Sequence, residues 1–114
     1  TLPRDIFVNL QRKAALLLGN SSCGLLEAPF LKLPVVNVGN RQKQRQHSEN
    51  IIFVQNDKEQ IKKAINRCIF DENFTNVCKN CTNPYGDGFS GKRIAKIISE
   101  TKIDNKLLNK QIVY

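Results

Sequence analysis

Methionine and tryptophan are absent from this sequence of 114 residues, histidine occurs once, and aromatic residues make up only 7%. Because the chain begins at Thr1 and contains no methionine, we expect it to be a fragment of a longer protein. No apolar run approaches the ~20 residues that span a bilayer, so we expect no transmembrane helix. Residues 1–11 also lack the basic and then apolar pattern of a secretory signal.

Acidic residues are scarce as well, with 10 Asp and Glu against 18 Lys and Arg, which gives a net charge of +8. A basic surface favours anionic partners such as nucleic acid, anionic lipid or phosphorylated small molecules. Most of the excess charge is spread along the chain, where it is expected to aid solubility. Arg41, Lys43 and Arg45, however, lie within five residues, with no acid before Glu49. This local cluster is the stronger candidate for a binding role.

Four cysteines are present, and Cys78 and Cys81 form a C-x-x-C pair, which is compatible with zinc or redox chemistry. A zinc site needs about four ligands, but a second close pair is missing and His47 is distant in sequence. The pair also follows a polar stretch, whereas a redox motif follows a strand. We therefore expect no metal site and unpaired thiols, as in a reducing cytoplasm.

Short apolar runs alternate with helical patterns along the chain, which is typical of an α/β fold with a parallel sheet. The expected strands are residues 16–18, 35–38 and 51–54, and the expected helices are 6–13, 23–31, a segment capped by Asn56 or Asp57, and 90–99. Residues 71–87 are expected to form a loop, and residues 100–114 a tail that is a short helix or frayed. Since a complete doubly wound domain usually has five or six strands, three strands indicate part of a domain.

Apolar spacing predicts which helix faces are buried. The first helix, capped by Asp5, would bury Phe7, Leu10 and Ala14. The central helix has apolar residues with helical spacing at positions 61, 64, 65, 68 and 69, which places Cys68 on the buried face. The last helix carries one apolar stripe, formed by Ile94, Ile97 and Ile98.

Residues 19–24 (GNSSCG) follow an expected strand and precede an expected helix. In a parallel α/β fold, ligands bind at this carboxyl end of the strands. Small residues, free N–H groups at the helix start and the hydroxyls of Ser21 and Ser22 favour phosphate. The alternative is an ordinary helix cap by one of these serines, and spacing alone does not separate the two.

Two further features belong to the same predicted edge. Glu27 lies among apolar residues, and a buried carboxylate needs hydrogen-bond donors, which favours a ligand-binding or capping role. The segment that begins at Arg41 follows the next strand, and arginine can grip a diphosphate with two hydrogen bonds. The alternative is a solvated surface loop.

Together, the stretch GNSSCGLLEAPFLKLPVVNVGNRQKQRQHSENIIFV and the later NPYGDGFSGKRI closely resemble the UDP-N-acetylglucosamine 2-epimerase family. The resemblance covers nearly all of residues 3–99. It implies a GT-B enzyme, with two Rossmann-like domains and an active site between them. This chain would be the C-terminal half: residues 1–99 would form part of the C-terminal nucleotide-binding domain, a three-layer α/β unit with a parallel sheet, and residues 100–114 a tail.

The loop sequences favour the hydrolysing branch of that family. Non-hydrolysing members typically carry a Thr-Glu-Arg-Pro-Glu run and an Asp-Ser-Gly-Gly loop, whereas this chain has GNRQKQR at 39–45 and Asn20-Ser21-Ser22. The hydrolysing branch releases free ManNAc and UDP for sialic acid synthesis, and related enzymes act on UDP-linked 2,4-diacetamido sugars for legionaminic acid. One departure is Gln44, where many relatives have glycine.

The resemblance also assigns roles to residues. Ser21 and Ser22 would contact the UDP phosphates, Gly24 would permit close packing below them, Glu27 would contact the ribose, and Arg41 would help to hold the nucleotide. The acid and base carboxylates of the reaction would lie mainly in an N-terminal domain that this chain lacks, which would leave the chain alone inactive. No cofactor is implied, and we expect the full-length enzyme to be a homo-oligomer.

Three alternatives remain open from the sequence: a non-hydrolysing epimerase, another GT-B sugar-nucleotide enzyme, and a basic nucleic-acid-binding module. No aromatic residue interleaves with the basic residues 41–45, although single-strand binders stack bases on aromatic rings. Nucleic acid is therefore the weaker alternative. His47 is the single candidate for an imidazole base, but it follows the binding loop without an obvious partner.

Overall fold

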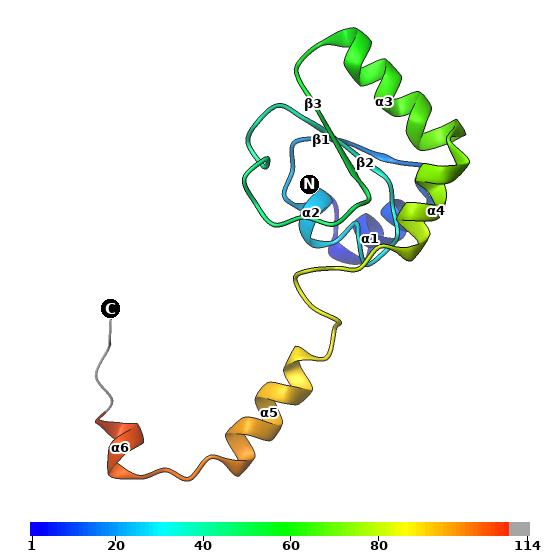
Figure 1. Ribbon diagram of the computed structural model, residues 1–114. Coiled ribbons are helices and arrows are strands. Elements are labelled where there is room, and N and C mark those ends of the chain that lie inside the picture. The colour runs from blue at the N-terminus through cyan, green and yellow to red at the C-terminus, as the bar shows by residue number, and fades with distance from the viewer. Residues whose placement is uncertain (110–114) are drawn as a thin grey trace.

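The computed structural model describes residues 1–109. Its centre is a three-stranded parallel sheet in the order β1 (Leu17–Gly19), β2 (Val35–Val38) and β3 (Ile51–Val54) (Figure 1). Leu17 pairs with Val35, which in turn pairs with Ile51, so the three strands end at the same edge. The parallel α/β sheet predicted from the sequence is confirmed. The first strand begins and ends one residue later than expected.

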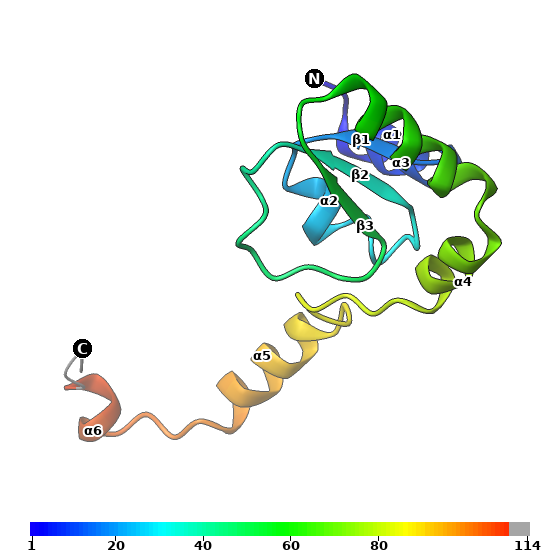
Figure 2. The same ribbon diagram turned by 45° about the horizontal axis from the view of Figure 1, so that its top comes forward.

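Helices cover both faces of the sheet, which gives three layers (Figures 1 and 2). On one face, α3 (Lys58–Phe70) and α4 (Glu72–Asn80) enclose a core that includes Val36, Cys68 and Phe74. On the other face, α2 (Cys23–Leu26) packs Leu25 against Val35 and Ile51. The helix α1 (Arg4–Lys13) lies beside α2, and residues of both helices line a shared cavity.

The helix α3 follows its sequence pattern closely. The Asp57 side chain accepts a hydrogen bond from Gln60 N at 2.8 Å, which confirms one of the two expected caps. Ala64 and Cys68 are buried, as the spacing predicted. Burial raises the pKa of the Cys68 thiol to about 11. This cysteine therefore belongs to the packing of the sheet.

Three other predictions were wrong in part. In α1 the helix begins after Pro3 without a side-chain cap, and its buried residue is Gln11, whereas Leu10 is 58% exposed. The helix expected over 23–31 ends at Leu26 and gives way to turns, because Pro29 lacks an N–H and disfavours helix at the preceding residue. The loop expected over 71–87 contains α4, whose first N–H groups are capped by Asp71.

Beyond the sheet, α5 (Ser90–Glu100) and α6 (Asn105–Leu108) project away from the packed layers (Figures 1 and 2). The radius of gyration is 18.8 Å, against about 13 Å for a compact chain of this length. The expected helix over 90–99 is confirmed, but it buries none of its side chains. The expected tail includes α6, while residues 110–114 lie outside the described residues. In the described chain, no helix has the length and apolar character needed to cross a membrane.

The turn that leads into α5 is held by Asp87. Its carboxylate accepts hydrogen bonds from Phe89 N and from both terminal nitrogens of Arg93. The hydrogen bonds from the Arg93 side chain lower the pKa of Asp87 to about 2. Gly86 and Gly88 of this turn have φ values of 138° and 89°, which L side chains rarely adopt.

Candidate functional site

The serine segment, residues 19–27, leaves β1 at the carboxyl edge of the sheet and contains α2. Ser22 is the N-cap residue of α2, yet its side chain makes no capping hydrogen bond. The Ser21 hydroxyl accepts a long bond from Cys23 N, at 3.4 Å. The capping hydrogen bond is therefore weak at Ser21 and absent at Ser22, so helix capping does not explain why two serines occupy these positions. Since α2 is one turn long, its dipole is small, and local N–H and hydroxyl groups are the donors that this segment offers to an anion.

Gly24, within the serine segment, is buried and faces the sheet. A Cβ atom at this position would lie 3.0 Å from Val35 Cγ1 and 3.5 Å from Leu17 Cδ2. Such a distance is too short unless the neighbouring side chain moves. The glycine thus lets α2 lie directly on β1 and β2.

The basic loop, residues 41–47, follows β2 at the same edge of the sheet. Arg41, Lys43 and Arg45 are exposed, and none of them belongs to an ion pair among the residues that the structure describes. Unlike the loop arginines, Arg67 and Arg93 are each paired with an aspartate. The positive charge of the basic loop is therefore not neutralised by a neighbouring carboxylate and can attract an anion.

The structure brings the basic loop and the serine segment together through Gln42. Its amide Nε2 donates to Asn20 O at 3.1 Å, and its Oε1 accepts from Arg45 Nη1 at 3.1 Å. The backbones of the basic loop and the serine segment therefore lie close together at one edge of the sheet, as expected from the strand order. Direct contacts of the Arg41 side chain with Ser21 or Ser22 are not found within the described chain.

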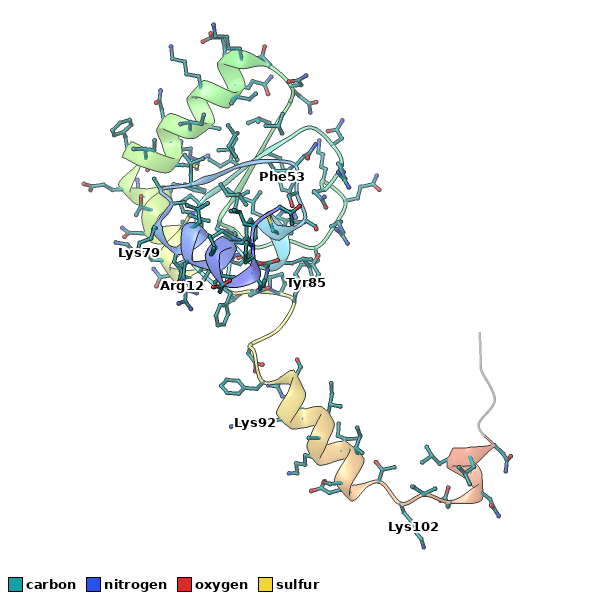
Figure 3. All side chains as sticks on the ribbon, turned by 180° about the vertical axis from the view of Figure 1, so that it is seen from behind. Arg12, Phe53, Lys79, Tyr85, Lys92 and Lys102 are labelled. Carbon is teal, nitrogen blue, oxygen red and sulfur yellow. The ribbon has the colours of Figure 1, made fainter. Side chains whose placement is uncertain are left out.

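Glu27 faces a cavity of about 420 Å³ between α1, α2 and residues 83–90. Its carboxylate pairs with the Arg4 guanidinium at 2.7 Å, which supplies the donor that the sequence required for this acid. Arg12 and Tyr85 line the same cavity and lie on the same side of the packed layers in Figure 3. Of the predicted ligand residues, Glu27 alone lines this cavity in the described structure.

The glycine turn, residues 83–88 (NPYGDG), lines the cavity that Glu27 faces, and it was not assigned a role from its sequence. The Tyr85 hydroxyl donates to Gln46 O at 2.7 Å, and Asn83 Nδ2 donates to Leu26 O at 2.9 Å. The turn therefore touches both the basic loop and the serine segment. Its unusual sequence was a signal that it has a specific role, but contacts 39 and 57 residues apart cannot be read from local spacing.

His47 has a structural environment rather than a catalytic one. Its Nδ1 lies 2.9 Å from Arg45 O, and its ring packs edge-on against Phe53 with 4.9 Å between centroids. No carboxylate or hydroxyl is bonded to its ring among the described residues. These contacts support a role in fixing the end of the basic loop.

The cysteines lie within the packed layers. Cys78 and Cys81 are buried, and burial is the largest cause that raises the pKa of Cys78 to about 11. A buried neutral thiol is a poor nucleophile and a poor metal ligand. Within residues 1–109, no three His, Cys, Asp or Glu side chains are grouped so as to hold a metal ion.

A family model described as UDP-N-acetylglucosamine 2-epimerase matches residues 1–99. A Legionella pneumophila protein named UDP-N,N'-diacetylbacillosamine 2-epimerase (hydrolyzing) is 31% identical over 113 residues, which are 99% of this chain and 29% of that protein. The Escherichia coli polysialic acid biosynthesis protein P7 is 44% identical over 69 residues, or 60% of this chain and 17% of that protein.

A Campylobacter jejuni protein named GDP/UDP-N,N'-diacetylbacillosamine 2-epimerase (hydrolyzing) is 46% identical over 46 residues, which are 40% of this chain and 12% of that protein. The chain thus spans less than a third of the length of each of these curated relatives. The family model nevertheless covers most of the chain and includes the serine segment, the basic loop and the glycine turn. This chain belongs to the UDP-N-acetylglucosamine 2-epimerase family.

Proposed function

We propose that this chain is the UDP-binding part of a hydrolysing UDP-N-acetylglucosamine 2-epimerase. The complete enzyme would convert UDP-GlcNAc, or a UDP-2,4-diacetamido sugar, and water into a free ManNAc-type sugar and UDP, for sialic or legionaminic acid synthesis. Two of the relatives carry the word hydrolyzing in their names, and a third is named for polysialic acid biosynthesis. These names support the hydrolysing branch over the non-hydrolysing one.

One observation carries the proposal: a basic loop without ion pairs among the described residues is hydrogen-bonded to a segment in which the Ser22 hydroxyl makes no capping bond, at the carboxyl edge of a parallel sheet. Hydroxyl and guanidinium donors bind the oxygens of a diphosphate. In this proposal Ser21 and Ser22 donate to the phosphates, and Arg41 neutralises their charge. Gly24 keeps the backbone close beneath them.

Glu27 would accept hydrogen bonds from the two ribose hydroxyls, as the family resemblance suggests. Its pairing with Arg4 at 2.7 Å supports an ionised carboxylate held at the cavity wall. An ionised carboxylate has two oxygens that can each accept more than one hydrogen bond. The ion pair therefore leaves acceptor positions for a diol.

In the proposed reaction, a base removes the proton on C2 of the sugar while the bond between C1 and the UDP oxygen breaks. Water then adds across the resulting double bond with inversion at C2. We expect the acid and base residues in an N-terminal domain outside this chain, and residues 1–99 to be part of the nucleotide-binding domain. The free, buried thiols are consistent with a reducing compartment, and we propose the cytoplasm. A homo-oligomer of the complete enzyme is part of the same proposal.

The test is a calorimetric titration of the 114-residue chain with UDP. We expect weak binding that Arg41→Ala and Ser22→Ala each weaken by at least about tenfold, because a hydrogen bond to a charged group contributes about 1.5–3 kcal/mol. Lys63→Ala, which removes an exposed charge from α3, is the control and should leave the affinity unchanged. Equal weakening by the control, or tight salt-dependent retention of an oligonucleotide instead of UDP, would contradict the proposal.

The hydrolysing reaction is tested separately with the intact enzyme and UDP-GlcNAc. Release of UDP together with free ManNAc would support hydrolysis, whereas formation of UDP-ManNAc would identify a non-hydrolysing epimerase. The isolated chain should release no ManNAc. Robust turnover by the chain alone would refute the expectation that the acid and base residues lie elsewhere.

A further inference from the structure

We propose that Gln42 and Tyr85 are positioning residues of the nucleotide site. They would hold the basic loop against the serine segment, so that its cations and the serine hydroxyls meet a diphosphate group together. This inference rests on the proposed function, and it adds two residues to which neither the sequence nor the family comparison gave a role.

Gln42 is the inward-facing residue of an otherwise exposed loop. Its exposed fraction is 3%, whereas Arg41 and Lys43 on either side are exposed. Burial of an amide costs free energy unless both of its ends are hydrogen-bonded. Both ends are used here, since Nε2 donates to Asn20 O and Oε1 accepts from Arg45. The side chain thus bridges the loops that follow β1 and β2 and also orients one cation of the basic loop.

Tyr85 holds the other end of the basic loop. Its hydroxyl donates to Gln46 O at 2.7 Å. The neighbouring Asn83 accepts from Tyr85 N at 2.9 Å and donates to Leu26 O at 2.9 Å. The three segments are therefore joined in a closed ring of hydrogen bonds, from the serine segment to the basic loop, on to the glycine turn, and back to the serine segment.

A loop with this charge needs such anchors. Three cations within five residues repel one another, and no carboxylate among the described residues pairs with them. A loop that is ordered before the ligand arrives does not lose that conformational entropy on binding. Anchoring by neutral side chains achieves the order without neutralising the charge that the ligand requires. Acidic side chains in the same places would stabilise the loop but would weaken its attraction for an anion.

The test compares Gln42→Ala and Tyr85→Phe with the control Asn66→Ala, which truncates an exposed amide side chain of α3, away from the site. Amide hydrogen exchange measures the order of each segment. We expect Gln42→Ala to speed exchange in residues 20–27 and 41–47, and Tyr85→Phe to speed it in 41–47. Exchange in β3 and α3 should be unchanged in both variants, and the control should match the unmodified chain. Faster exchange throughout the sheet would indicate a role in overall stability and would overturn the proposal.

The second readout is the affinity for UDP. Gln42→Ala and Tyr85→Phe should each bind UDP about three- to tenfold more weakly, as expected when a hydrogen bond that anchors the loop is lost, and the control should bind UDP like the unmodified chain. Saturating UDP should restore slow exchange in residues 41–47. Faster loop exchange with unchanged affinity would overturn the proposal. If the unmodified chain does not bind UDP, the proposed function fails. Inorganic diphosphate is then the probe, and the same variants must weaken its binding for the positioning role to stand.

Discussion

Helices α3 and α5 have the same kind of sequence and different surroundings. Both carry isoleucines with helical spacing, and both form the helix that this spacing predicts. The helix α3 is capped by Asp57 and buries Ala64 and Cys68 against the sheet. The helix α5 has no side-chain cap and buries no residue in the described structure. The periodicity therefore specifies the helix and its apolar face, but it does not specify which surface covers that face.

The two regions that contain these helices differ in how much apolar surface they bury. The packed part, residues 4–81, holds the sheet and both buried clusters. The projecting part, residues 90–108, exposes its apolar side chains, among them Ile97 at 62% and Leu108 at 68%. Because apolar burial is the main favourable term in folding, the stability of this chain should reside in the packed part.

The largest expected effect is that of Leu25→Ala. Leu25 is fully buried between α2 and the sheet, and truncation of a buried leucine costs about 2–5 kcal/mol of unfolding free energy. The matched control is Leu108→Ala in α6, which should change the free energy by less than about 0.5 kcal/mol. Urea denaturation measures both. Similar losses for the two leucines would contradict the division into a packed and a projecting part.

A smaller effect is expected from pH. Burial raises the pKa of Cys68 and Cys78 to about 11, while thiols of the unfolded chain ionise near 9. As the pH rises from 9 to 11, the unfolded chain loses these protons before the folded chain does, so the stability should fall across this window. The denaturation midpoint should therefore decrease. The double variant Cys68→Ala and Cys78→Ala should show a shallower decrease, and an equally steep one would exclude the thiols as its cause.

Much of the packed part could be predicted because its signals are local. The strands β2 and β3 and the helix α3 are apolar runs or stripes with clear boundaries, and the structure has them where they were expected. The helix α4 was missed because Asn73, Thr75 and Asn76 made the segment look like a loop. Phe74 and Cys78, spaced i, i+4 and both buried, together with the cap residue Asp71, were the signal for it.

The site could be predicted only in part, and for a different reason. The serine segment and the basic loop each follow a strand, so the topology alone places them at one edge. The contacts of Gln42 with Asn20 and of Tyr85 with Gln46 depend on how the loops cross the top of the sheet. No local spacing encodes such contacts. In the same way, the donor to Glu27 is Arg4, 23 residues earlier and on another helix.

The smallest expected effect is that of Ile97→Ala, and it is the sharpest test of the comparison. Because Ile97 is 62% exposed, removal of three carbons from its side chain should change the unfolding free energy by less than about 0.5 kcal/mol. The corresponding change in α3, Ile61→Ala, should cost more, because Ile61 packs against the buried cluster on the sheet. A loss above about 2 kcal/mol for Ile97→Ala would mean that α5 folds back onto the sheet in solution. The apolar stripes of α3 and α5 would then both be buried against the packed part. The projecting part would not be a separate region.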